Sequence, residues 1–306
     1  MTEIKNMGQI KGGKARIAGI RNKNRYFKLL HSSARLKAKK VKHIINWKIR
    51  TKIGKEIINK KINPSPLIIA MLLTDGHVYK KRNCFEIGFA SKSSSLLYLF
   101  LDLIKIWNRK QIVSKYIDKN RVTRLYFHLP IKNEFIKSVK SFKTSPRNQS
   151  VRNYLKEDQP NIDFLENMDN ECKRLFLRII LSLDGGITNR KGIKRIQPSI
   201  FLRCAHLSLC KFYQKIANDF SIKLRIEKDK SKWSGIDGLS TTKIESIKKF
   251  KEIGGFVDGL KISKKSKYFY NIKKNFLLNS YIRNSVKVEG PASSAWIDKK
   301  SKATPF

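Results

Sequence analysis

Apolar residues concentrate in two long runs, each of which ends in an acid followed by a glycine. The first run, residues 67–76, reads LIIAMLLTDG, and the second, residues 174–185, reads RLFLRIILSLDG. Pro66 favours a helix start, and a glycine favours a helix end because it adopts the left-handed conformation at little cost. We therefore predict two buried helices that end at Asp75 and Asp184.

The acid at the end of each run is electrostatically unusual. The C-terminal end of a helix carries a partial negative charge, so an aspartate there costs roughly 0.3–1 kcal/mol. A bound divalent cation would reverse the sign of that cost. Asp-Gly is also a common turn dipeptide, and for one copy that simpler interpretation is preferable. Because the arrangement occurs twice, we favour a cation bound by Asp75 and Asp184.

The same succession of patterns follows each run. Two segments, an amphipathic helix, two more segments and a further helix come after each predicted buried helix, and most of the segments alternate between apolar and polar residues as strands do. In the first half we expect a short strand or turn at 77–81, a strand at 84–90, a helix at 93–108, strands at 112–117 and 121–128, and a helix at 130–139. In the second half we expect a turn at 185–192, a strand at 195–203, a helix at 206–220, strands at 222–227 and 233–239, and a helix at 241–253. Sequential hairpins favour antiparallel pairing. The predicted fold class is therefore α+β, with two αββαββα repeats.

These patterns divide the chain into five parts. They are a basic N-terminal arm (1–65), a first repeat (66–143), a linker (144–168), a second repeat with a closing helix (169–284) and a disordered tail (285–306). Within the arm, apolar residues recur at every fourth position from Val41 to Ile57, which predicts a helix that Gly54 breaks or ends.

Charge narrows the choice of partner. The net charge is +44, from 67 basic and 23 acidic residues, and a polyanion such as nucleic acid suits it because neutralised phosphates release counterions. A membrane surface would also attract this charge, but the sequence contains no apolar run of about 18 residues and no signal peptide, so we expect no membrane association.

Cysteine usage bears on location. The four cysteines form no Cys-x-x-Cys pair, which favours an intracellular, reducing compartment over a disulfide framework. The spacing of Cys204, His206 and Cys210 matches no common zinc site. The many Ile, Lys and Asn residues suggest an AT-rich coding sequence, which leaves an organelle, an archaeon or a phage-infected cell open.

The polar faces of the predicted strands carry donors suited to base edges. Leu125 and Phe127, for example, alternate with polar residues that would lie on the opposite face of the sheet. Arginine reads guanine, and glutamine reads adenine, in the DNA major groove. An ordinary solvated sheet face is the alternative interpretation. The candidate DNA-binding residues are Arg124, His128, Arg195, Gln197, Ser199, Arg203, Lys223 and Arg225.

Residues 68–76 and 177–185 resemble the two motif helices of single-chain LAGLIDADG homing endonucleases, and the resemblance covers about residues 66–280. It implies that the two helices pack together at a pseudo-twofold axis and that each antiparallel sheet lies in the DNA major groove. It also implies that Asp75 and Asp184 bind Mg²⁺ beside the scissile phosphates, so that each DNA strand is cut once.

The chemistry agrees with this resemblance. Divalent ions can activate water and neutralise the charge of a phosphodiester transition state, and Mg²⁺ needs only one or two protein carboxylates. Lysines would assist, with Lys80, Lys92, Lys191 and Lys194 as candidates. We thus expect a monomeric, Mg²⁺-dependent endonuclease that cuts double-stranded DNA at a long asymmetric site, with Asp75 and Asp184 as catalytic acids. The alternatives are an RNA-binding intron maturase without cleavage and a DNA-binding regulator on the same scaffold.

Overall fold

The structure is a computed structural model that describes residues 42–118, 120–137, 160, 162–191, 196–229, 234–263, 266 and 269–286. Most of the predicted arm, most of the predicted linker and nearly all of the predicted tail lie outside these residues. So do the candidate DNA-binding residue Arg195 and the candidate lysine Lys194.

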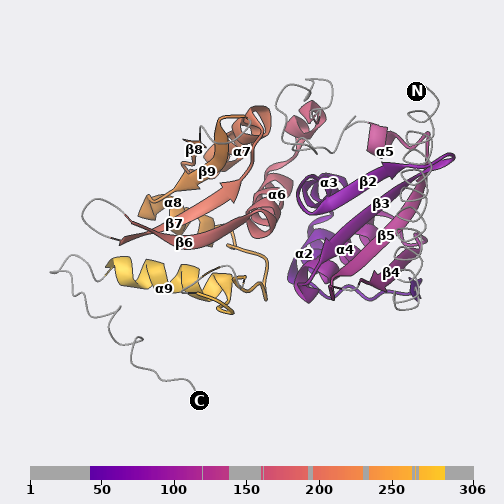
Figure 1. The fold of residues 1–306 in the computed structure, drawn as a ribbon, viewed down its shortest axis with the longest axis horizontal. Coiled ribbons are helices and arrows are strands. Elements are labelled where there is room, and N and C mark those ends of the chain that lie inside the picture. The colour runs from indigo at the N-terminus through magenta and orange to yellow at the C-terminus, as the bar shows by residue number, and fades with distance from the viewer. Residues whose placement is uncertain are drawn as a thin grey trace, which may run out of the picture.

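The first half is a five-stranded antiparallel sheet whose apolar face is covered by helices (Figure 1). The strand order is β1-β4-β5-β3-β2. In chain order the elements are β1 (Lys42–Ile44), α2 (Lys52–Lys60), α3 (Ser65–Thr74), β2 (Gly76–Lys80), β3 (Cys84–Ser91), α4 (Ser94–Trp107), β4 (Val113–Ile117), β5 (Thr123–Pro130) and α5 (Glu134–Lys137). Phe89 and Phe127, from neighbouring strands, are buried beside Phe100 of α4.

The second half repeats this arrangement. Its four strands are ordered β6-β7-β9-β8, which matches β2-β3-β5-β4 of the first sheet. Its elements are η3 (Asp163–Asn167), α6 (Asn170–Leu183), β6 (Gly185–Lys191), β7 (Ile196–Arg203), α7 (Leu207–Asp219), β8 (Arg225–Lys228), β9 (Ile236–Thr241), α8 (Ile244–Glu252) and α9 (Lys274–Val286). The predicted α+β class with two antiparallel sheets and two αββαββα repeats is confirmed.

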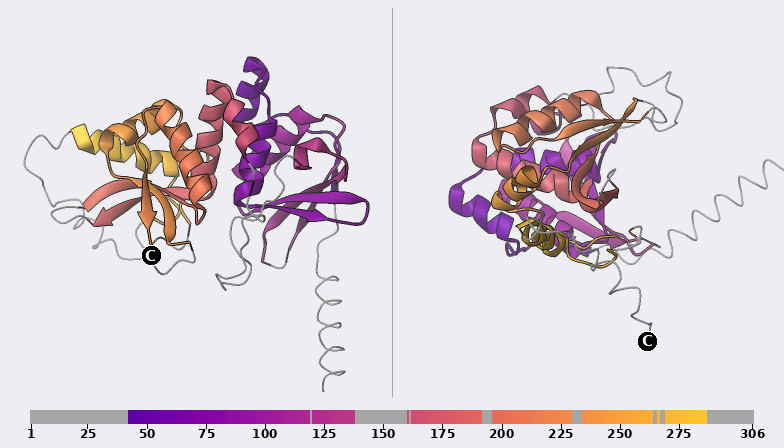
Figure 2. Two further views of the ribbon diagram at one scale, coloured as in Figure 1. Left: turned by 90° about the horizontal axis from the view of Figure 1, so that it is seen from above. Right: turned by 90° about the vertical axis from the view of Figure 1, so that its left-hand side faces the viewer.

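The two halves meet along α3 and α6, which pack against each other at the centre of the molecule (Figure 1). Every residue from Leu67 to Leu73 is buried, because α3 contacts α6 on one side and α4 on another. Ion pairs between α2 and α6 add to the junction, including one from Arg174 to Glu56 and one of 2.9 Å from Lys60 Nζ to Glu171 Oε2. Both sheets lie on the same side of these helices (Figure 2).

The helix predicted from Val41 to Ile57 is wrong over residues 42–50. Residues 42–44 form β1, which extends the first sheet by pairing with β4, and a helix begins only at Lys52. The buried carboxylate of Asp102 in α4 explains the change, because it accepts hydrogen bonds from Trp47 Nε1 (2.6 Å) and from the Thr51 backbone N–H (2.7 Å). Gly54 lies inside α2, where it neither breaks nor ends the helix.

Other predicted boundaries also change. The expected turn at 185–192 is instead the strand β6, because it pairs with β7 along its whole length. The expected helix at 130–139 begins only at Glu134 as α5, since Pro130 still belongs to β5. The strand expected from Ile222 begins only at Arg225. In the part of the predicted linker that the structure describes, Ile162 and Leu165 are buried, whereas a surface connector was expected. No helix among the described residues is long and apolar enough to cross a bilayer.

Candidate metal and DNA site

Asp75 and Asp184 occupy equivalent positions at the C-terminal ends of α3 and α6. The glycine that follows each acid has a different role from the one predicted, since neither Gly76 nor Gly185 adopts a positive φ. A Cβ on Gly76 would lie 2.4 Å from Leu72 Cα, and one on Gly185 would lie 2.5 Å from Leu181 O. Glycine is therefore required because strand and helix backbones approach too closely for a side chain.

The environment of both acids disfavours their charge. Burial raises the pKa of Asp184 to about 7, and the nearby charge of Asp75 contributes to the increase. Asp75 is the more exposed of the two, but partial burial raises its pKa as well. Two carboxylates that are close together and partly removed from water are a costly arrangement for a site without a nearby cation.

Lys274, the first residue of α9, supplies a positive charge at this site. Its Nζ donates hydrogen bonds to Ser182 O (2.8 Å) and to Gly185 O (2.7 Å), which flank Asp184 in the sequence. Burial lowers the pKa of Lys274 to about 8, although the charges of Asp75 and Asp184 act in the opposite direction. One ammonium group thus lies at the negative end of α6 and acts electrostatically on both acids.

Lys274 was not among the lysines that the sequence suggested. Lys80 and Lys92 are exposed and do not contribute to the shifted pKa values of either aspartate. The side chain of Lys191 and the whole of Lys194 lie outside the described residues. A docked α9 explains the position of Lys274, because Asn275 accepts a hydrogen bond from the Phe256 backbone N–H (2.9 Å) and donates one to its carbonyl oxygen (2.8 Å).

The donor set suits a hard divalent cation of the Mg²⁺ kind. Two carboxylates at adjoining helix ends match the one or two that Mg²⁺ takes from protein, with water and phosphate oxygens completing its octahedron. The raised pKa values of both acids are in keeping with this, since a bound dication would stabilise their ionised forms. Among the described residues no cluster of three or more His, Cys, Asp or Glu side chains could hold a metal ion.

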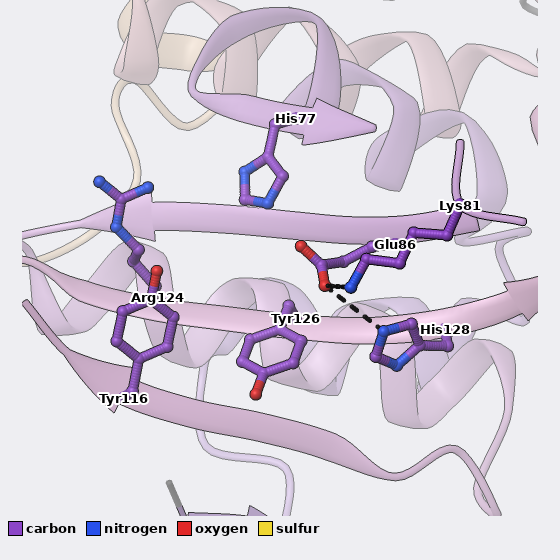
Figure 3. Close-up of a pocket in the computed structure, with 7 residues that line it drawn as sticks. All are labelled: His77, Lys81, Glu86, Tyr116, Arg124, Tyr126 and His128. Atoms are coloured by element: carbon purple, nitrogen blue, oxygen red, sulfur yellow. Dashed lines mark hydrogen bonds and ion pairs between the residues drawn. The ribbon is translucent and has the colours of Figure 1, made fainter. Parts of the chain in front are cut away.

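The first sheet presents a polar outer face that includes two of the candidate DNA-binding residues. Arg124 and His128 lie on β5, opposite in direction to buried Leu125 and Phe127, as the alternation predicted. Arg124 Nη2 is 3.3 Å from Asp118 Oδ2. His128 Nε2 is 3.4 Å from Glu86 Oε2, a pair that Figure 3 shows.

The second sheet presents fewer of its candidates than expected. Gln197 is half-buried, whereas Arg203 and Arg225 are exposed, and Arg225 Nη2 is 3.2 Å from Glu227 Oε1. Lys223 is exposed but precedes β8 and so lies outside the strand. Ser199 lies on the central strand β7 and is only 2% exposed, so it is a poor candidate for a base contact.

No protein-family model and no curated protein matches the sequence. A mesophilic variant of the homing endonuclease I-DmoI is similar to this structure with 16% identity and a TM-score of 0.42, over 62% of this chain and 94% of that one. The N-terminal LAGLIDADG domain of DUF199/WhiA is similar with 16% identity and a TM-score of 0.41, over 72% of this chain and 97% of that one. The meganuclease I-SmaMI bound to uncleavable DNA is similar with 12% identity and a TM-score of 0.37, over 64% of this chain and 85% of that one.

Both halves of this chain have the αββαββα order, and the paired helices α3 and α6 each end in an acid. This is the arrangement that the resemblance noted in the sequence implied. The C-terminal ends of α3 and α6 lie between the two sheets (Figure 2).

Proposed function

We propose that this protein is a site-specific endonuclease that hydrolyses both strands of double-stranded DNA with Mg²⁺ held by Asp75 and Asp184. The observation that carries the proposal is the placement of two carboxylates and one buried ammonium at adjoining helix ends. All three groups have pKa values shifted toward neutrality, and such shifts are typical of sites that handle charge or protons.

Each group has a distinct role in this proposal. Mg²⁺, when bound, would activate water and neutralise charge that builds on the phosphate. Asp75 and Asp184 would hold the cation through their ionised carboxylates. Lys274, fixed by two carbonyl oxygens, would donate to a phosphate oxygen or stabilise the negative charge of the transition state. A monomer suffices, because both acids come from one chain.

The two sheets would hold the DNA. Their outer faces bear Arg124, Arg203 and Arg225, whose planar guanidinium groups suit guanine edges and phosphates. The net charge of +44 favours association with any polyanion, so we assign affinity mainly to charge and sequence preference to the sheet faces.

A second candidate is a DNA-binding protein that does not cut. It is favoured by the hydrogen bonds that Lys274 Nζ makes to Ser182 O and Gly185 O. An ammonium that already neutralises the end of α6 would allow the paired acids to persist without a metal.

The test is selection from a randomised duplex library, followed by cleavage of the selected sequence with Mg²⁺ and with EDTA. Asp75→Asn and Asp184→Asn are the variants, and Asp219→Asn is the matched control. Asp219 lies away from the site, where its carboxylate forms an ion pair of 2.8 Å with Lys173 of α6. The proposal predicts Mg²⁺-dependent double-strand cleavage by the wild type and the control, and its loss in both site variants. Selection without any cleavage would support the second candidate. In a parallel selection from a randomised RNA library, a preference for RNA over duplex DNA would support a maturase.

A further inference from the structure

The outer face of the first sheet contains a hollow of about 530 Å³ with a single carboxylate at its floor. The carboxylate belongs to Glu86 on β3, which lies between β5 and β2 in the sheet. Rings from Tyr116, Tyr126 and His77 line the hollow (Figure 3). An acid in this position is unexpected on a surface that faces DNA, since it opposes the attraction of phosphates.

Glu86 contacts Lys81 and His128 through the same carboxylate oxygen. Lys81 Nζ donates to Glu86 Oε2, and His128 Nε2 lies 3.4 Å from the same oxygen. The other carboxylate oxygen points away from both partners in Figure 3. Burial opposes ionisation of Glu86, but the hydrogen bond and charge of Lys81 outweigh it and keep the pKa of Glu86 below its usual value. The group is therefore an ionised acceptor at neutral pH.

A glycine beside Glu86 on the outer face of β3 makes room for the His77 ring. On β3 the next outward position is Gly88, and a Cβ there would lie 2.2 Å from the His77 ring. Tyr126 is the partner of Gly88 on β5, and its ring centroid is 5.9 Å from that of His128. The hollow of about 530 Å³ beside these rings leaves room for the edge of a base pair at the carboxylate.

Glu86 and Lys81 together present an acceptor beside a donor. In the major groove, a C·G pair presents the N4 amino donor of cytosine beside the O6 and N7 acceptors of guanine. The acid suits the cytosine amino group, and the ammonium suits guanine. Thymine O4 or guanine O6 opposite the carboxylate would place two acceptors together, which disfavours those bases.

We propose that Glu86 and Lys81 form a specificity-determining pair that selects one C·G base pair in the half-site read by the first sheet, with cytosine at Glu86. This inference rests on the proposed binding of duplex DNA, but not on cleavage. It assigns one position of the target to a defined pair of side chains.

The experiment is duplex site selection by binding in EDTA, so that cleavage does not affect the result. The proteins are the wild type, Glu86→Gln and Lys81→Met. The matched control is Glu166→Gln, because Glu166 and Lys215 form a similar ion pair (3.1 Å) between η3 and α7, away from the sheets. Circular dichroism spectra and melting curves of all four proteins establish that each is folded.

We expect the wild type and the control to select C·G at one position by roughly 5- to 150-fold over other pairs. Glu86→Gln should lose this preference there or change it to adenine, which glutamine reads, with other positions unchanged. Lys81→Met should weaken the preference at the same position. An unchanged selection profile in folded Glu86→Gln would overturn the proposal. If the wild type selects no duplex sequence, or only unpaired strands, the proposed function fails and this inference fails with it.

Discussion

Replacing Asp184 with asparagine should stabilise the metal-free protein, and increasingly so as the pH rises. Asparagine preserves the shape of the side chain but carries no charge. Burial raises the pKa of Asp184 to about 7 from its ordinary value of 3.8. A raised folded-state pKa contributes stability that is fully present below about pH 4 and is lost as the pH rises through about 7. Wild type, but not Asp184→Asn, should show this loss.

The size of the effect follows from the shift. At about 1.36 kcal/mol per pH unit, the ionised acid costs up to about 4 kcal/mol at pH 8. Lys274 reduces the gain in the variant, because its ammonium loses a partner whose charge favours it. We therefore expect the advantage of Asp184→Asn to be about 1–3 kcal/mol at pH 8 and much smaller at pH 5.

The assay is urea unfolding of both proteins in EDTA at pH 5, 6, 7 and 8, with Asp219→Asn as the control. Asp219 is part of a more exposed ion pair, so its substitution should cost at most about 1 kcal/mol with no such trend. Added Mg²⁺ should raise the stability of wild type but not of Asp184→Asn, because only wild type would bind the ion. The reasoning is refuted if Asp184→Asn is less stable than wild type at pH 8 in EDTA.

Three other predictions follow from the same contacts. The cleavage rate of the wild type should rise with pH as Asp184 ionises and fall above about pH 8 as Lys274 loses its proton. A pH–rate profile of Lys274→Met should show a rate lower by about 100-fold or more, without the decline at high pH. Asp102→Ala should destabilise the protein by about 3 kcal/mol or more in urea unfolding, because Trp47 Nε1 and three other donors lose a buried acceptor; an effect below about 1 kcal/mol would contradict this. Arg178→Met should cost about 2–3 kcal/mol in the same assay, because two carbonyl oxygens lose the buried guanidinium that joins α6 to the segment after α8; equal stability would show that those hydrogen bonds contribute nothing.

The alternating and helical patterns were sufficient to predict the repeated core. Leu125 and Phe127 are buried where the period of two placed them, and each half folds around a motif helix as predicted. These signals are local, since each depends on residues within one element. Both acids were likewise predicted as site residues from their positions at the ends of the predicted helices.

The arm was mispredicted because its signal was local but its structure is not. The four-residue spacing from Val41 indicated one helix, whereas pairing of β1 with β4 and hydrogen bonds to Asp102 determine the actual path. A carboxylate on α4, about 50 positions further along the chain, supplies those hydrogen bonds. Tertiary contacts of this kind override a short periodic pattern.

Lys274 could not be identified for a related reason. It is one of 67 basic residues, and its neighbour Lys273 has the same charge at the start of the same helix segment. What distinguishes Lys274 is burial beside Ser182 O and Gly185 O, which requires α9 to dock beneath the end of α6. Glu86 was not among the predicted DNA contacts, because an acid opposes the attraction of phosphates, although a carboxylate also reads the amino group of a base.

The central claim is that Asp75 and Asp184 together hold a divalent cation, and Mn²⁺ titration followed by electron paramagnetic resonance tests it most directly. Free Mn²⁺ gives a strong signal that weakens on binding, so the bound ion is counted without any need for cleavage. In the presence of the selected DNA duplex, wild type and Asp219→Asn should bind Mn²⁺ beyond what the duplex alone binds, and Asp75→Asn and Asp184→Asn should each lose that binding. Undiminished binding by both folded variants would contradict the account.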